Sequence, residues 1–244
     1  MVSGPNQVVL LLVGAVPLLV GVLALRSAWR RYRFVKRVSG ANADPVDVGE
    51  ITPGQTAVEG TARVASETVA APFTDERGLL SVGETLTPSQ SGDGTDSLTS
   101  DERAVESVPF TVEDGTGTVA VDAEPGTYHL RAERFDPGDV DQGALDGWTD
   151  RTGVDPGNPN AYRQQLLTPG EDVYVFGEAS AAGPDAKRRS PDADWQLRAG
   201  AEDIIVSTQG RAELGGSNLV VAVILFVLGG AFTLMGLLFW TGLL

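Results

Sequence analysis

The residues of this sequence that could do chemistry are mainly carboxylates, 33 in all, with one histidine, His129. Cysteine is absent, which excludes disulfides, cysteine zinc sites, iron–sulfur clusters and cysteine nucleophiles. A single histidine is also too few for a histidine zinc site or for a relay between two histidines. His129 lies in the strand-like segment TYHLRAERF, so we interpret it as a structural residue rather than a catalyst.

Asp139, Asp141 and Asp150 stand at positions one, three and twelve of an EF-hand-like spacing. The match fails because position five is Gly143, which has no side-chain ligand, and position six is Ala144 instead of glycine. We also predict no helix on either side of this segment. A solvated acidic loop is therefore favoured over a calcium site.

Residues 114–117 read Asp-Gly-Thr-Gly and could suggest a loop that cradles phosphate. Such loops lead from a strand into a helix, whereas a strand-like segment follows here, so we predict a hairpin turn. The sequence has no nucleophile elbow and no P-loop signature. Residues 187–189 (Lys-Arg-Arg) could touch anionic lipid, although an exposed basic loop without that role is favoured. We expect no catalytic residue, no metal and no cofactor, and the binding residues stay unidentified.

Two uncharged apolar runs lie near the ends of the chain, at residues 8–25 and 219–240. The first would extend about 27 Å as a helix, close to the thickness of a bilayer core, so both are predicted to be transmembrane helices. In each run two glycines are seven residues apart, Gly14 and Gly21, then Gly229 and Gly236, which favours close packing of the two helices.

The basic residues near the first run are all on one side of it. Residues 1–25 contain no Lys or Arg, whereas residues 26–37 contain six. A cleaved signal peptide has the opposite arrangement, with positive charge before the apolar stretch. The positive-inside rule therefore predicts an integral cell-membrane protein with residues 1–7 and the C-terminus outside and a basic juxtamembrane segment, 26–37, inside with the central domain.

The central part of the chain is strongly acidic. Residues 38–217 contain 12 basic and all 33 acidic residues, a formal balance of −21. Nucleic acid is therefore excluded as an expected partner. The acids are dispersed and lysine occurs only at positions 36 and 187, a pattern typical of halophilic proteins that work in molar salt. Halophilic adaptation is therefore favoured over an acidic binding surface as the explanation of the charge.

Short β-branched or aromatic segments separated by Gly, Pro and Asp predict a mainly β domain. The expected strands cover residues 56–65, 79–82, 107–112, 118–122, 128–134, 162–168, 173–179, 195–198 and 204–208. The clearest hairpin is 107–122, with Phe110 and Val112 on the core side, and a second is expected to turn at Pro169 and Gly170. The predicted fold is a small antiparallel β-barrel or sandwich flanked by two transmembrane α-helices. Residues 86–103, 136–160 and 181–194 are too polar for a core and are predicted to be acidic loops.

The order of several short motifs between the two apolar runs resembles the GIDE domain, also called the beside-a-membrane domain. These motifs are VEGTA at 58–62, APF at 71–73, VPF at 108–110, VEDGTG at 112–117, LTPGE at 167–171 and VYVFGEA at 173–179. The family's domain lies between the two transmembrane helices of mitochondrial membrane-anchored E3 ubiquitin ligases. The resemblance covers residues 50–213 together with the two predicted spans.

The resemblance implies a module that contacts partners beside the membrane. Ligase activity does not carry over, because the ligases depend on a cysteine-rich RING domain and this sequence has no cysteine. From the resemblance we expect a membrane-anchored interaction or scaffold module that is not an enzyme. Its partners would be the lipid bilayer and a membrane or cytoplasmic protein. The alternatives are a component of a ubiquitin-like or membrane-protease pathway, a hydrolase that uses the acidic loops, and a purely membrane-structural subunit.

Overall fold

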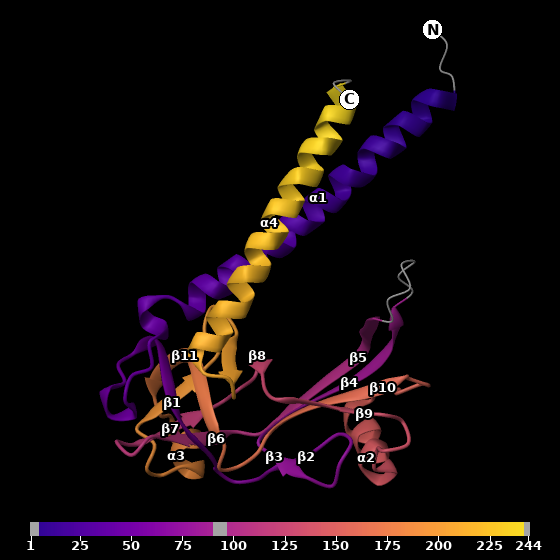
Figure 1. The fold of residues 1–244 in the computed structure, drawn as a ribbon. Coiled ribbons are helices and arrows are strands. Elements are labelled where there is room, and N and C mark those ends of the chain that lie inside the picture. Colours follow the sequence, from indigo (N-terminus) through magenta and orange to yellow (C-terminus); the bar gives the residue numbers. More distant parts are fainter. Residues whose placement is uncertain (1–4, 90–96, 242–244) are drawn as a thin grey trace. The chain divides into compact units, whose positions relative to one another are not determined.

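A computed structural model describes residues 5–89 and 97–241 of the chain. It contains two compact units (Figure 1). One combines the residues up to Ala41 with those from Arg211 onward, and the other is Asn42–Gly210. The second unit is rich in β-structure and carries two short α-helices.

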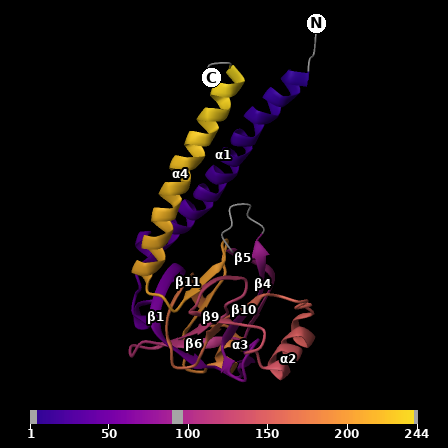
Figure 2. The same cartoon turned by 45° about the vertical axis from the view of Figure 1, so that its right-hand side comes forward.

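The first unit consists of two long helices, α1 (Pro5–Val38) and α4 (Arg211–Thr241), which run side by side (Figures 1 and 2). They meet at glycines. A Cβ atom added to Gly21 would lie 2.4 Å from the Thr233 hydroxyl oxygen and 2.9 Å from the Gly229 carbonyl oxygen. The predicted close packing of the two helices therefore occurs at Gly21 and Gly229. The surroundings of Gly14 are outside the described part.

Outside this contact, the helices expose many large apolar side chains. The exposed fraction is 65% for Leu19, 56% for Leu23, 66% for Val227 and 60% for Leu234. Among the side chains that the structure describes, no helix combines the length and apolar composition needed to span a membrane. Parts of both predicted spans, including residues 8–14 and 219–220, are outside those described side chains.

The centre of the second unit is a five-stranded β-barrel made of β1 (Gly54–Val64), β6 (Phe110–Glu113), β7 (Thr118–Val121), β11 (Asp172–Ala181) and β12 (Trp195–Arg198). The order around the barrel is β1-β6-β7-β12-β11, and β11 returns to pair with β1. Because β7 and β12 are parallel, the barrel is not purely antiparallel as predicted.

Strand β1 closes the barrel by pairing with two partners. Its residues 54–61 pair with β11 and residues 61–64 pair with β6. Gly60 lies just before the change of partner, where an added Cβ would be 2.4 Å from the Glu113 carbonyl oxygen. Glycine therefore permits the close backbone approach at which the barrel closes.

The barrel core is formed by alternate, inward-facing residues of these strands. Val58, Phe110, Val112, Val175 and Leu197 are fully buried in one apolar cluster. The hairpin predicted over residues 107–122 is confirmed, as is the core position of Phe110 and Val112. Two short strands extend the sheet beyond β11, namely β13 (Ile204–Ser207) and β8 (Gly126–His129), which pair in parallel.

A separate four-stranded sheet has the order β5-β4-β10-β9. Its strands are β4 (Leu80–Ser89), β5 (Ser97–Ser107), β9 (Ala132–Phe135) and β10 (Ala161–Leu167). The prediction that β10 and β11 form a hairpin is wrong, because β10 pairs with β4 and β9. The predicted strand at 128–134 is likewise divided between two sheets. The small pair β2 (Val69–Ala70) and β3 (Arg77–Gly78) precedes β4.

The predicted loop at 86–103 is wrong in its described part, because residues 86–89 and 97–103 belong to β4 and β5. Residues 90–96 lie outside the described residues. Thr85 and Leu86 are buried although the surrounding sequence is polar. These strands form because each pairs with a neighbouring strand of the sheet. The few apolar residues of this segment do not indicate that pairing.

The predicted loop at 136–160 is wrong at its centre, where α2 (Gln142–Thr152) forms. The Asp141 side chain accepts a hydrogen bond from the Ala144 amide, and Gly153 ends the helix with a φ of 70°. Leu145 and Trp148 are buried three residues apart, which gives one narrow apolar face. Trp148 and Phe73 make an edge-to-face contact with ring centres 5.3 Å apart.

The third predicted loop, 181–194, contains the short helix α3 (Pro184–Arg189). Proline at its first position supplies a φ suited to helix initiation. Only Ala186 of this helix is buried, and it packs with Ala120 and Ala193. Such a small apolar contact is too weak a periodic signal to predict a helix. Two single-turn 3-10 helices, η1 (Ala41–Ala43) and η2 (Val48–Glu50), lead into β1.

Candidate functional site

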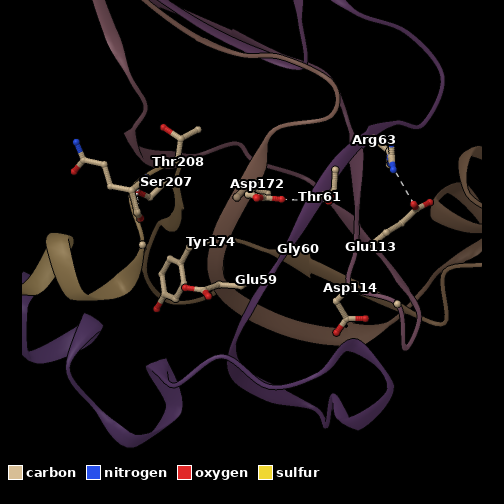
Figure 3. A pocket seen from close by; sticks show the side chains of 14 residues that line it. Glu59, Gly60, Thr61, Arg63, Glu113, Asp114, Asp172, Tyr174, Ser207 and Thr208 are labelled. Atoms are coloured by element: carbon tan, nitrogen blue, oxygen red, sulfur yellow. Dashed lines mark hydrogen bonds and ion pairs between the residues drawn. The ribbon is translucent and has the colours of Figure 1, made fainter.

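The β-rich unit has a groove of about 580 Å³ on the outside of the barrel (Figure 3). It lies over β1, the start of β11, the β6–β7 turn and residues 207–210 after β13. We call this the acidic groove. Its lining residues are Glu59, Gly60, Thr61, Arg63, Glu113, Asp114, Gly115, Asp172, Val173, Tyr174, Ser207, Thr208, Gln209 and Gly210.

The period of two along a strand explains why these residues share a surface. On β1, Val58 and Ala62 face the core, so Glu59, Thr61 and Arg63 face outward. Glu59 is directly opposite Tyr174 on β11, and Thr61 is opposite Asp172. The polar residues of VEGTA and VYVFGEA, which carry the sequence resemblance, therefore come together only when the barrel closes.

The charges of the groove are unbalanced. Four carboxylates, those of Glu59, Glu113, Asp114 and Asp172, line it against one guanidinium. Arg63 Nε and Glu113 Oε2 are 3.2 Å apart, and the Thr61 hydroxyl donates to Asp172 Oδ1 at 3.3 Å. The exposed ion pair is worth little in water, so an excess of negative charge faces the solvent.

Asp114 is held by the turn that it caps. Its Oδ1 accepts hydrogen bonds from the Thr116 amide at 2.8 Å and hydroxyl at 2.7 Å, and Oδ2 accepts from the Val48 amide at 2.6 Å. Burial alone raises the pKa of Asp114, but these hydrogen bonds and one from the Gly117 amide outweigh burial, so its pKa lies below the ordinary value. Asp114 therefore has a structural role at the edge of the groove.

Tyr174 forms an aromatic part of the groove wall. Its hydroxyl donates to the Ala43 carbonyl at 3.1 Å, which ties the segment before β1 to β11. Burial, and then the neighbouring Glu59 carboxylate, raise the pKa of Tyr174. The phenol is therefore neutral at physiological pH and serves as a hydrogen-bond donor.

His129 and Ser207 lie side by side at the ends of two parallel strands, β8 and β13. The Ser207 hydroxyl is within hydrogen-bonding distance of the carbonyl oxygens of His129 and Gln209, at 3.1 and 2.8 Å. Burial lowers the pKa of His129, which favours its neutral form. Because the hydroxyl contacts backbone carbonyls, this pair has the geometry of a strand end and not of an activated nucleophile.

The acidic residues of the calcium-like spacing have other positions in the structure. Asp141 is the N-cap of α2, while Asp150 lies near the other end of the same helix. Within residues 5–89 and 97–241, no group of three or more potential ligands is placed to hold a metal ion. The interpretation of this segment as a solvated loop missed the helix, although Asp141 and Gly153 were readable as its two caps.

The basic residues 187–189 lie on α3, where they pair locally. Lys187 Nζ is 2.8 Å from Asp194 Oδ1, and Arg188 pairs with Asp185. Ala186 of α3 packs with Ala120 of β7.

From the sequence alone, none of the residues that line the groove was predicted to form a binding site. Glu59 and Tyr174 are 115 positions apart, and only strand pairing makes them neighbours. No protein-family model, no curated protein and no solved structure matches this chain.

Proposed function

We propose that this chain is a membrane-anchored interaction module without catalytic residues of its own, which holds a basic segment of a protein partner in the acidic groove. The observation that carries the proposal is the groove itself, about 580 Å³ in volume, with four carboxylates against one arginine. A partner segment rich in Lys or Arg complements this charge, and electrostatic complementarity gives an interface its specificity.

The shape and chemistry of the groove also favour a protein partner. β1, the start of β11 and residues 207–210 border the groove, and Gln209 and Gly210 are exposed along it. Nucleic acid is disfavoured because its phosphates would meet the same carboxylates.

The anchoring role is proposed for α1 and α4. Large apolar side chains of both helices are exposed, among them Leu19, Leu23, Val227 and Leu234. Exposed apolar surface of this extent marks an interaction site, and a bilayer is the partner that complements it on all sides of a helix pair. Anchored at both ends, the β-rich unit would face the cytoplasm, and a weak contact would gain effective concentration at the membrane.

The groove can be tested with a photo-reactive amino acid placed at Thr61, inside it, or at Asp192, an exposed position that does not line it. Both full-length variants are expressed in native membranes and irradiated. We expect the Thr61 probe to capture one defined peptide segment rich in Lys or Arg. Equal capture at Asp192, or an acidic segment captured at Thr61, would refute the proposal.

A charge-reversal pair gives a matched control. In a Thr61-probe background, Glu59→Lys should reduce the captured peptide at least tenfold, because it replaces a negative charge in the groove with a positive one. Asp192→Lys makes the same charge change elsewhere and should leave the yield unchanged. Since the sequence has no cysteine, a single Asp192→Cys variant also tests orientation: the thiol should react with an impermeant reagent only after the membrane is opened.

A further inference from the structure

A row of charged side chains crosses the four-stranded sheet from edge to edge. The pairing places Arg103 of β5 opposite Glu84 of β4, Glu84 opposite Arg163 of β10, and Arg163 opposite Arg134 of β9. Directly paired residues share one face of a sheet, so all four side chains project to the same side. We call this set the arginine row; Figure 1 shows the order of its strands.

The centre of the row is a buried carboxylate. The Glu84 side chain is 6% exposed and accepts from Arg163 Nε at 2.7 Å, while Arg103 Nε is 3.3 Å from its other oxygen. Both arginine side chains remain partly exposed, at 48% for Arg103 and 41% for Arg163. Each guanidinium has five N–H donors, so donors remain beyond those that face Glu84.

Arg134 completes the row and is the unusual member. It is exposed and lies directly opposite Arg163, and within the described residues the structure pairs it with no carboxylate. Like charges that face each other across strands are destabilising. Three guanidinium groups stand against one carboxylate, although the acidic residues of this unit greatly outnumber the basic ones. The arginine row is therefore locally positive, whereas the unit as a whole is strongly negative.

We propose that Arg163 and Arg134 form a binding site for a phosphate group. Two neighbouring guanidiniums can each direct paired N–H donors at the oxygens of one tetrahedral anion, which gives the bidentate geometry that arginine makes with phosphate. The bound anion relieves the repulsion between the two arginines. Glu84 serves as a positioning residue because it holds the Arg163 guanidinium from the opposite side.

The phosphate could be free inorganic phosphate or the headgroup phosphate of a lipid, and the experiment separates the two. Full-length protein in a non-ionic detergent is examined by hydrogen exchange with and without inorganic phosphate, with chloride holding the ionic strength constant. A second arm adds phosphatidic acid to the micelles, with phosphatidylcholine as its reference. The amides read out are those of residues 132–135 and 161–167, which form β9 and β10.

We expect slower exchange in these two strands in at least one arm, because a ligand that binds the native state suppresses local opening. Protection by inorganic phosphate identifies the free anion, and protection by phosphatidic acid alone identifies a lipid headgroup. Arg134→Gln should weaken the response at least tenfold in concentration. Arg198→Gln removes the same charge from an exposed position on β12 and should respond as the unmodified protein does.

Two results would overturn the proposal. One is no protection of β9 and β10 in either arm. The other is equal protection in the Arg134→Gln and Arg198→Gln variants, which would mean that phosphate acts through general screening. Exchange in the barrel strand β1 serves as the internal reference for the fold of each variant. Neither result bears on the acidic groove, which none of the four residues of the arginine row lines.

Discussion

The five-stranded barrel and the four-stranded sheet belong to one compact unit but are stabilised in different ways. The barrel closes around Val58, Phe110, Val175 and other apolar residues that are fully buried. The four-stranded sheet contributes Leu80, Val82 and Leu167 to the same apolar cluster, but it also buries the polar residues Glu84 and Gln164. A second apolar cluster beside this sheet is formed by Trp148 and Leu145 of α2 together with Phe73 and Tyr162.

The difference lies in how much each region depends on specific partners. Apolar packing in the barrel is non-directional and tolerates imperfect neighbours. A buried carboxylate needs defined donors, and Gln164 likewise accepts from the Phe73 amide at 3.1 Å. The sheet is therefore the region where the loss of one polar partner has the larger consequence, whereas the barrel responds mainly to lost volume.

Removing an aromatic ring from the barrel should have the largest effect. Phe110→Ala deletes a fully buried side chain and should reduce the free energy of unfolding by about 3–5 kcal/mol. Denaturant unfolding monitored by circular dichroism measures the change. Glu113→Ala, three residues along the same strand and exposed, should change stability by less than about 0.5 kcal/mol. Equal losses in the two variants would mean that Phe110 is not a core residue.

Removing the carboxylate of the arginine row should reduce stability somewhat less than the loss of Phe110. Glu84→Ala leaves Arg103 and Arg163 without their shared carboxylate, and we expect a loss of about 2–3 kcal/mol because both guanidiniums can still reach water. The same unfolding measurement applies. Asp192→Ala removes an exposed carboxylate and should be nearly neutral. A Glu84→Ala variant as stable as this control would show that the sheet does not depend on its buried ion pairs.

The smallest expected effect concerns the turn between β6 and β7, and it depends on pH. Asp114→Ala removes the acceptor for four hydrogen bonds, so we expect a loss of about 1–2 kcal/mol at neutral pH. The pKa of Asp114 is lowered in the folded state, so its stabilising contribution is present above the unfolded pKa and disappears as the pH falls through the folded value. The difference from the unmodified protein should therefore shrink on acidification. A difference independent of pH down to about 2 would contradict this assignment.

Much of the barrel could be predicted from the sequence because its signals are local. Alternation placed Phe110 and Val112 in the core, and Asp114 to Gly117 identified the turn that joins β6 and β7. The four-stranded sheet could not be predicted in the same way. Near Ser89, where β4 ends, and Ser97, where β5 begins, both strands are mostly polar on both faces. The alternation of apolar and polar residues is therefore weak there, although the strands continue.

The acidic groove and the arginine row were both missed for a related reason. Each is assembled from strands far apart in the chain, and charged residues such as Glu59 and Arg134 carry no local sign that they face one another. Helix α2 is different, since its caps Asp141 and Gly153 were readable. It was overlooked because Leu145 and Trp148 alone make a weak apolar stripe.

The sequence by itself determined that the unit between the two apolar segments is β-rich and acidic, that it lacks cysteine chemistry, and which side of the β6–β7 hairpin is buried. These properties follow from composition and short-range periodicity, which act over a few residues. Only the tertiary structure decided that β11 returns to β1 and that β10 joins β4 instead of β11. Strand partners are chosen by the burial of whole faces at once, so their pairing, and every site built across it, is a property of the folded chain.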